Sequence, residues 1–235
     1  CTVALGGDGG DELFGGYDHH RRLLRMQQGL GLLPLPLRQG AAAAAQALLP
    51  IGFKGRNWLQ ALGTDMRTEL PLIASQFDAR TRRQLLAGRP GHALVAEGIL
   101  HQRTPAEPDL LQRATRMDFN DYLAEDILVK VDRASMLNSL EVRAPLLDHR
   151  LVEFAFGRVP GHLKATQTGR KILLKHLVAK LLPPSFDKQR KQGFSIPLAA
   201  WLKAGPFREL FWSVLTDPKC LFNRAGVRRL LDGQD

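Results

Sequence analysis

The stretch LGGDGGDELFGGY, residues 5–17, decides the fold that the sequence predicts. The apolar run VAL at residues 3–5 is typical of a buried strand, and DELF at residues 11–14 is typical of the start of a helix. A strand, a glycine-rich turn and a helix are therefore predicted in that order. In open α/β sheets, ligands bind at the carboxyl ends of the strands, which is where this turn would lie.

The acidic residues of this loop limit the ligands that it can bind. Glycine lets a ligand approach bare backbone, but Asp8, Asp11 and Glu12 repel a phosphate unless a cation lies between them. The loop lacks the G-K-[ST] ending of a Walker A sequence and the alternating acids of an EF-hand. It predicts either a Mg²⁺–phosphate site or a carboxylate base. Helix capping alone would explain Asp11 and Glu12, but it does not explain Asp8.

Composition argues against two classes of protein. The chain has 235 residues, of which 44% are hydrophobic, and it contains no uninterrupted apolar run long enough to cross a membrane. Its net charge of +10 invites comparison with proteins that bind nucleic acid. The paired arginines are scattered, however, and lack interleaved aromatic side chains, so we expect neither nucleic acid nor a membrane as a partner.

The cysteines and histidines form no recognised metal or disulfide pattern. Cys1 and Cys220 lie at opposite ends of the chain without C-x-x-C spacing, which favours a reducing, cytoplasmic location. His19 and His20 are adjacent, and neighbouring residues of a helix point in different directions. We therefore expect both histidines on the surface rather than around a metal ion.

A charged helix is predicted from Asp118 onward. Apolar residues recur there at helical spacing, and an acidic stripe follows another face of the same helix. Such a stripe is usually solvated, and Asp126 and Lys130 are an ordinary i, i+4 pair on it.

Two helix starts follow. Asp148 ends a polar, charged loop at residues 139–147 and is an expected N-cap. Further on, GRK at residues 169–171 opens a helix with Lys171 in its first turn, where a cation opposes the helix dipole. A lysine in that position is tolerated beside an anion such as phosphate, although exposed lysines also occur there without a function.

Four blocks in this order resemble the C-terminal synthetase domain of the glutamine-dependent asparagine synthetases. They are LGGDGGDELFGGY at 5–17, DILVKVDRASMLNSLEVRAPLLDHRLVEFA at 126–155, GRKILLKHL at 169–177 and RKQGFSIPLAAWL at 190–202. The resemblance is strong at the two ends of the chain and loose over residues 25–110.

The resemblance implies a nucleotide alpha-hydrolase-like α/β fold. This chain would supply one short N-terminal strand and a mostly α-helical remainder. Residues 1–235 would form the C-terminal part of the asparagine synthase domain. Within it, residues 1–24 would hold the strand, the glycine-rich acidic loop and a helix, residues 25–117 a variable helical region, and residues 118–235 a helical region with family motifs.

Members of this family use ATP to adenylate the side-chain carboxylate of aspartate, and ammonia from glutamine then displaces AMP. By resemblance, Gly7 lies at the nucleotide, Asp8 takes a proton from the attacking ammonia, and Asp11 helps to hold Mg²⁺–pyrophosphate. This is physically sensible, because a carboxylate can accept the proton and a metal screens the acids from pyrophosphate.

Three more residues receive roles through the resemblance. Lys171 and Lys191 would neutralise the pyrophosphate that leaves. Asp126 would lie nearby, as a second metal ligand or as an acid that orients the pyrophosphate. ATP and Mg²⁺ are thus the expected cofactors, with aspartate and ammonia as substrates and a homodimer among the assemblies that the resemblance allows.

The sequence also departs from the family. The family often reads S-G-E-G where this chain has Gly6 and Asp8, so the acid reaches about one methylene less far. The family's S-G-G-x-D-S loop, which binds the ATP pyrophosphate, and its N-terminal glutaminase domain do not occur in these residues. We therefore expect a fragment that is inactive alone and whose partner is the missing glutaminase domain.

Two alternatives stay open. One is a related amidotransferase that acts on another carboxylate, in a polysaccharide or a peptide. The other is a basic helical scaffold without chemistry, with nucleic acid as its ligand. Asp8, Asp11 and Lys171 favour a ligase over the scaffold.

Overall fold

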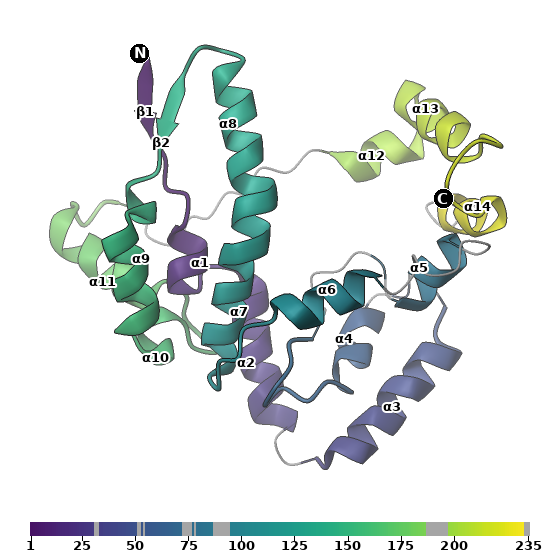
Figure 1. Ribbon diagram of the computed structural model, residues 1–235, viewed down its shortest axis with the longest axis horizontal. Coiled ribbons are helices and arrows are strands. Elements are labelled where there is room, and N and C mark those ends of the chain that lie inside the picture. The colour runs from purple at the N-terminus through teal and green to yellow at the C-terminus, as the bar shows by residue number, and fades with distance from the viewer. Residues whose placement is uncertain are drawn as a thin grey trace. The chain divides into compact units, whose positions relative to one another are not determined.

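The computed structural model describes residues 1–30, 33–50, 53, 55–71, 77, 79–86, 95–186 and 197–232. The chain divides into two compact units (Figure 1). Unit 1 comprises Cys1–Leu35, Thr64–Pro71 and Arg103–Gln189, and unit 2 comprises Pro36–Gly63, Leu72–Gln102 and Arg190–Asp235. None of the helices in the described part of the chain is long and apolar enough to cross a membrane.

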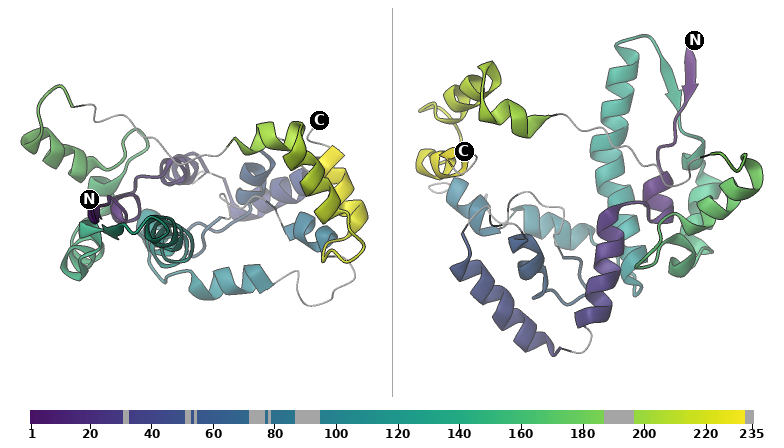
Figure 2. Two further views of the ribbon diagram at one scale, coloured as in Figure 1. Left: turned by 90° about the horizontal axis from the view of Figure 1, so that it is seen from above. Right: turned by 180° about the vertical axis from the view of Figure 1, so that it is seen from behind.

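Unit 1 contains a parallel sheet of two short strands, β1 (Val3–Leu5) and β2 (Glu141–Arg143). The strands lie side by side next to α8 (Leu128–Met136) in both the front and the rear view (Figures 1 and 2). The prediction of a single strand is therefore wrong. The charged residues Glu141 and Arg143 are exposed and only Val142 between them is partly buried, so the pattern resembled a loop, and pairing with β1 makes the segment a strand.

The glycine-rich turn follows β1 directly, as predicted. The Gly6 amide donates to the Arg143 carbonyl at 2.7 Å, which extends the pairing by one residue. The chain then turns at Gly9, whose φ of 88° is left-handed, and enters helix α1 (Gly10–Phe14). A Cβ at Gly9 would also overlap the side chain of Leu147, so this position needs glycine for two reasons.

Helix α1 lies at the centre of unit 1. It contacts α7 (Leu110–Asp118), η1 (Phe119–Ile127), α9 (His149–Gly157), α10 (Gly161–Lys164) and α11 (Ile172–Leu181). Leu13 and Phe14 of α1 are buried against Ala155, and this core is completed by partly buried side chains of three elements: Phe119, Leu151, Val152, Phe156, Leu173 and Leu174. The glycine-rich loop is thus followed directly by a helix that is anchored in the apolar core.

A long helical run crosses unit 1 in three parts: α7 (Leu110–Asp118), η1 (Phe119–Ile127) and α8 (Leu128–Met136). Asp109 caps its start by accepting a hydrogen bond from the Gln112 amide at 2.8 Å. The sequence predicted the helix but not that its middle part, η1, is a π-helix. Such widened turns are rare and occur frequently at functional sites.

The remaining helices of unit 1 are short, apart from α2 (Asp18–Leu30). The 3₁₀ turn η2 (Pro145–Leu147) leads to α9 (His149–Gly157), and Asp148 caps α9 as predicted, through the Arg150 amide at 3.0 Å. Next come α10 (Gly161–Lys164) and α11 (Ile172–Leu181).

Unit 2 is helical in its described part. Its helices, two of which begin or end one residue inside unit 1, are α3 (Leu35–Leu48), α4 (Arg56–Ala61), α5 (Ala79–Leu85), α6 (Val95–Arg103), α12 (Leu198–Lys203), α13 (Pro206–Leu215) and α14 (Arg224–Asp232). Helix α14 contacts α5, and the Asn223 amide donates to the Leu85 carbonyl at 2.6 Å.

A buried arginine joins separate segments of unit 1. Arg113 of α7 is 1% exposed, and its guanidinium donates to the backbone carbonyls of Met66, Arg67, Glu69, Glu107 and Pro108. Burial lowers the pKa of Arg113, against the attraction of nearby carboxylates. The side chain therefore holds residues 64–71 against the start of α7 through the backbone rather than through an ion pair.

We expect Arg113→Met to lower the free energy of unfolding by about 3 kcal/mol, because it leaves several buried carbonyls without donors. Urea unfolding followed by circular dichroism measures this. Arg103→Met is the matched control, since Arg103 is exposed and pairs with Asp121 at the surface, where little change is expected. Equal effects of the two substitutions would contradict the structural role of Arg113.

Candidate functional site

The candidate site lies at the carboxyl ends of the two strands, around the loop from Gly6 to Gly9. Gly7 is exposed, and a Cβ there would meet nothing within 4 Å, so the backbone is open to a ligand. Asp8 is half-buried. A Cβ at Gly6 would come within 2.7 Å of Asp8 Oδ2, so the short acid folds back over the space that a serine at that position would fill.

Asp11 and Lys171 form an ion pair at this edge. Lys171 Nζ lies 3.1 Å from Asp11 Oδ1, and both side chains are partly open to solvent, at 31% and 25% exposure. The structure thus joins two residues that the sequence singled out from separate segments. Lys171 is not in the first turn of α11, however, but is its N-cap residue, with a left-handed φ of 51°.

Gly16 makes room for this pair. A Cβ at Gly16 would overlap both Asp11 Oδ1 and Lys171 Cε. The backbone of Gly16 is also held, since its amide donates to the Asp11 carbonyl at 2.7 Å and its carbonyl accepts from Arg170 Nη1 at 3.3 Å. Gly16, in the third glycine pair of the loop, therefore permits close packing of the charged side chains.

Arg170 is a cation of the site that sequence reasoning missed. Its Nη1 lies 3.0 Å from Asp18 Oδ1, at the start of α2. Together with Lys171 it places two positive side chains next to the acidic loop. Its position beside Lys171 in the family-like block GRK was the available signal.

A buried acid lies behind the loop. Glu12 is 1% exposed and accepts a hydrogen bond from the Tyr17 hydroxyl. Burial raises the pKa of Glu12, and the bond from Tyr17 only partly opposes this; the same burial and bond raise the pKa of Tyr17. The ring of Tyr17 meets Tyr122 of η1 edge-on, with centroids 5.7 Å apart.

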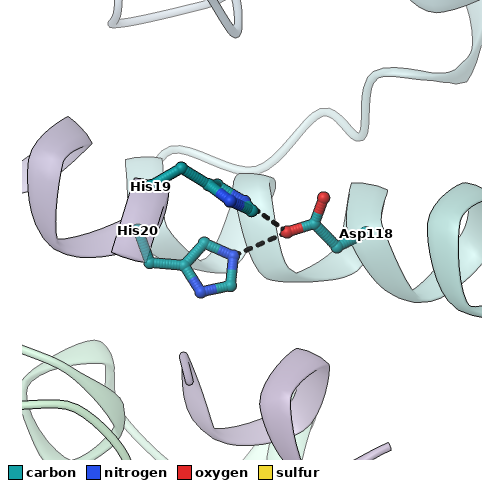
Figure 3. A group of neighbouring side chains, drawn as sticks. All are labelled: His19, His20 and Asp118. Carbon is teal, nitrogen blue, oxygen red and sulfur yellow. Dashed lines mark hydrogen bonds and ion pairs between the residues drawn. The ribbon is translucent and has the colours of Figure 1, made fainter. Parts of the chain in front are cut away.

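His19 and His20 of α2 both point to one carboxylate (Figure 3). The Nε2 atom of each imidazole lies 2.7 Å from the same oxygen, Oδ2 of Asp118, at the end of α7. The prediction that both histidines are surface residues is wrong, because His20 is fully buried and His19 is 25% exposed. Asp118 is likewise bonded rather than solvated; a tertiary contact with α2, invisible in the local pattern, explains both differences.

The electrostatics of this group follow from its burial. Burial lowers the pKa of His20, and the hydrogen bond to Asp118 only partly opposes this. For Asp118, burial disfavours the charged form, but the bonds from His19 and His20 leave the pKa of its carboxyl below the ordinary value. The stable arrangement at neutral pH is therefore a carboxylate beside a neutral His20 imidazole.

Asp126 and Lys191 are the two remaining predicted site residues. Asp126 lies on η1, is more than half exposed, and pairs with Lys130 at 3.8 Å, as its spacing predicted. Lys191 lies outside the described residues. Their assigned roles at pyrophosphate stay predictions.

A family model and several curated proteins match this chain. A family model described as "Asparagine synthase" matches residues 1–235. The chain is 32% identical over 235 residues to a putative asparagine synthetase (glutamine-hydrolyzing) of Mycobacterium tuberculosis, covering 98% of this chain and 35% of that protein. It is 30% identical over 203 residues to asparagine synthetase (glutamine-hydrolyzing) 1 of Bacillus subtilis, covering 86% of this chain and 32% of that protein.

The chain therefore spans about a third of the length of these curated relatives. No solved structure matches it. The nucleotide alpha-hydrolase-like class accordingly stays a prediction, whereas the structure has an α/β character, mostly helical with a short parallel sheet.

Glu12 yields a pH-dependent prediction. Because its pKa is raised in the folded chain, its contribution to stability is full below its ordinary pKa and is lost as the pH rises through the raised value. Glu12→Gln keeps an acceptor for Tyr17 but cannot ionise. We expect its unfolding free energy, relative to the unsubstituted protein, to increase as the pH rises above 4.5.

Urea unfolding at several pH values measures this difference. Glu153→Gln in α9, at an exposed glutamate, is the matched control for the loss of one charge. A difference for Glu12→Gln that stays constant, or that shrinks as the pH rises, would contradict the buried-acid interpretation.

Proposed function

The chain belongs to the asparagine synthase family, and on that premise we propose that it forms part of an ATP-dependent ligase that amidates the side-chain carboxylate of aspartate. In this reaction a carboxylate oxygen attacks the α-phosphorus of ATP and pyrophosphate leaves. Ammonia then attacks the carbonyl carbon of the acyl-adenylate, AMP leaves, and the nitrogen loses a proton to a base. Ammonia would come from glutamine, in a part of the protein outside these residues.

The Asp11–Lys171 pair is the observation that carries this proposal. It follows the glycine-rich loop at the carboxyl edge of a parallel sheet, where α/β proteins bind ligands. Lys171 would neutralise charge on the leaving pyrophosphate, and its Nζ lies 3.9 Å from the position that a Cβ at Gly10 would take, at the end of the loop. Arg170, one residue earlier, adds a second positive charge.

The residues present fit a Mg²⁺ ion. Asp11 offers a carboxylate that is 25% exposed, which is the hard oxygen ligand that Mg²⁺ prefers. When bound, Mg²⁺ supplies positive charge that screens the acids of the loop from the phosphates. Asp11 would hold it, with Asp126 proposed as a second acid and Lys191 as a further cation at pyrophosphate.

Asp8 is proposed as the acceptor of the ammonia proton. It is half-buried at the loop, on the same strand end as the exposed Gly7. An acid in such a position accepts a proton effectively if it reaches the attacking nitrogen. Relative to the S-G-E-G pattern, this chain has glycine in place of serine at position 6 and aspartate in place of glutamate at position 8. Because Asp8 Oδ2 lies where a side chain at Gly6 would stand, the shorter acid occupies the space of the missing serine side chain.

Gly16→Ala tests the role of the ion pair. The added methyl group overlaps Asp11 and Lys171, so we expect AMP formation by the full-length protein to fall about 100-fold, as displaced groups at a reacting centre commonly cause. The control is Gly29→Ala on α2, where a Cβ would meet nothing within 4 Å. An unchanged rate for Gly16→Ala would argue against a function of the pair.

Asp8→Ala tests the proton acceptor. We expect AMP and pyrophosphate release from ATP to depend on aspartate in the full-length protein, and the variant to lose amide formation by about 100-fold or more while adenylation falls less. Both products and the amide are measured in one assay. Release driven by another carboxylate would replace aspartate as the substrate, and no release with any carboxylate, together with salt-dependent binding to arbitrary DNA, would favour the scaffold.

A further inference from the structure

We infer that His19, His20 and Asp118 form a binding site for a divalent transition-metal ion, of the class of Zn²⁺, separate in its ligands from the Asp11–Lys171 pair. One atom from each residue lies within 4.8 Å of the others. The site is assigned from geometry and ligand chemistry, and the proposed ligase reaction does not require it.

The convergence of the two histidines is the first argument. Successive residues of an α-helix point about 100° apart, so adjacent side chains do not normally reach one point. Here the rings of His19 and His20 meet edge-on, with centroids 4.4 Å apart, and both direct Nε2 to Oδ2 of Asp118 (Figure 3). Three ligand atoms thus gather around one point, from α2 and from the end of α7.

The ligand set is the second argument. Two imidazole nitrogens and one carboxylate oxygen match the nitrogen and oxygen ligands of Zn²⁺, Co²⁺ and Ni²⁺, whereas Mg²⁺ and Ca²⁺ prefer oxygen alone. Three protein ligands with water in the remaining position are also a common arrangement for zinc. The three side chains therefore favour a transition-metal ion such as Zn²⁺ over the Mg²⁺ ion that is proposed at Asp11.

Distances require only a small opening of the site. Tetrahedral zinc ligands at about 2.0–2.2 Å from the ion lie roughly 3.3–3.6 Å from one another. The observed Nε2–Oδ2 separations of 2.7 Å are those of hydrogen bonds, so each nitrogen would move away from the carboxylate oxygen by roughly 0.6–0.9 Å. His19, at 25% exposure, and Asp118, at 19%, leave a side through which an ion can enter, while His20 is fully buried.

Neighbouring side chains hold the ligands in place, and a buried acid lies close to them. Glu12 is buried nearby, and its carboxyl experiences the negative charges of Asp11 and Asp118. The ring of Tyr17 stacks on His19 at 5.3 Å between centroids and lies against His20 at 5.5 Å. Asp118 stands where α7 changes into the π-helix η1, a distortion frequent at functional sites.

Zinc binding by the full-length protein tests the inference. The protein is stripped with a chelating resin and titrated with Zn²⁺ in excess Mg²⁺, so that sites with oxygen ligands are already filled. We expect the unsubstituted protein to bind one Zn²⁺ per chain at this site. In His19→Gln and in Asp118→Asn, the affinity for this ion should fall at least about 10- to 100-fold. Visible absorption of bound Co²⁺ reports the same ligands independently.

These two substitutions keep hydrogen-bonding groups, so a purely structural triad would survive them. His101→Gln, at an exposed histidine of α6, is the matched control and should bind Zn²⁺ as the unsubstituted protein does. Circular dichroism confirms that each variant folds. The inference is overturned if the unsubstituted protein holds no such Zn²⁺, or if His19→Gln and Asp118→Asn retain it with unchanged affinity.

Discussion

Parallel pairing between β1 and β2 is the interaction on which the arrangement of unit 1 depends. It joins the start of the chain to Glu141–Arg143 and continues into the bond from the Gly6 amide to the Arg143 carbonyl. Because parallel strands end at the same edge, the glycine-rich loop after β1 and the turn η2 after β2 come together there. Leu147 of that turn then packs where a side chain at Gly9 would stand.

Helix α1 combines acidic residues with a stable core because its two faces contact different partners. Leu13 and Phe14 of α1 bury apolar surface against α9, and Asp11 on the same short helix meets Lys171 at the rim. One helical turn therefore both anchors the loop and presents its charge. The glycines at 9 and 16 permit the close approach of Leu147 and Lys171, respectively.

Hydrogen bonds of buried polar side chains join segments of unit 1 in addition to the apolar packing. Arg113 is satisfied entirely by backbone carbonyls, and Lys164, also buried, donates to Gln112 with its pKa lowered by burial to about 8. Glu12 with Tyr17, and Asp118 with two histidines, repeat this arrangement around the loop. Each such group is costly if left without a partner, so these contacts specify one arrangement of the helices.

The order of strand, loop and helix at the start of the chain, the cap at Asp148, the Asp126–Lys130 pair and the family could all be predicted from sequence. Each is encoded in residues close together or in a continuous block. Prediction from sequence failed at Glu141–Arg143, at His19 and His20, and at the π-helix, where local composition indicates a loop, a surface and an ordinary helix. These features depend on long-range contacts, since a strand needs a partner strand and a buried imidazole needs a distant carboxylate. Only the tertiary structure decided that Asp11 meets Lys171, because the distance between side chains far apart in sequence depends on how the chain packs.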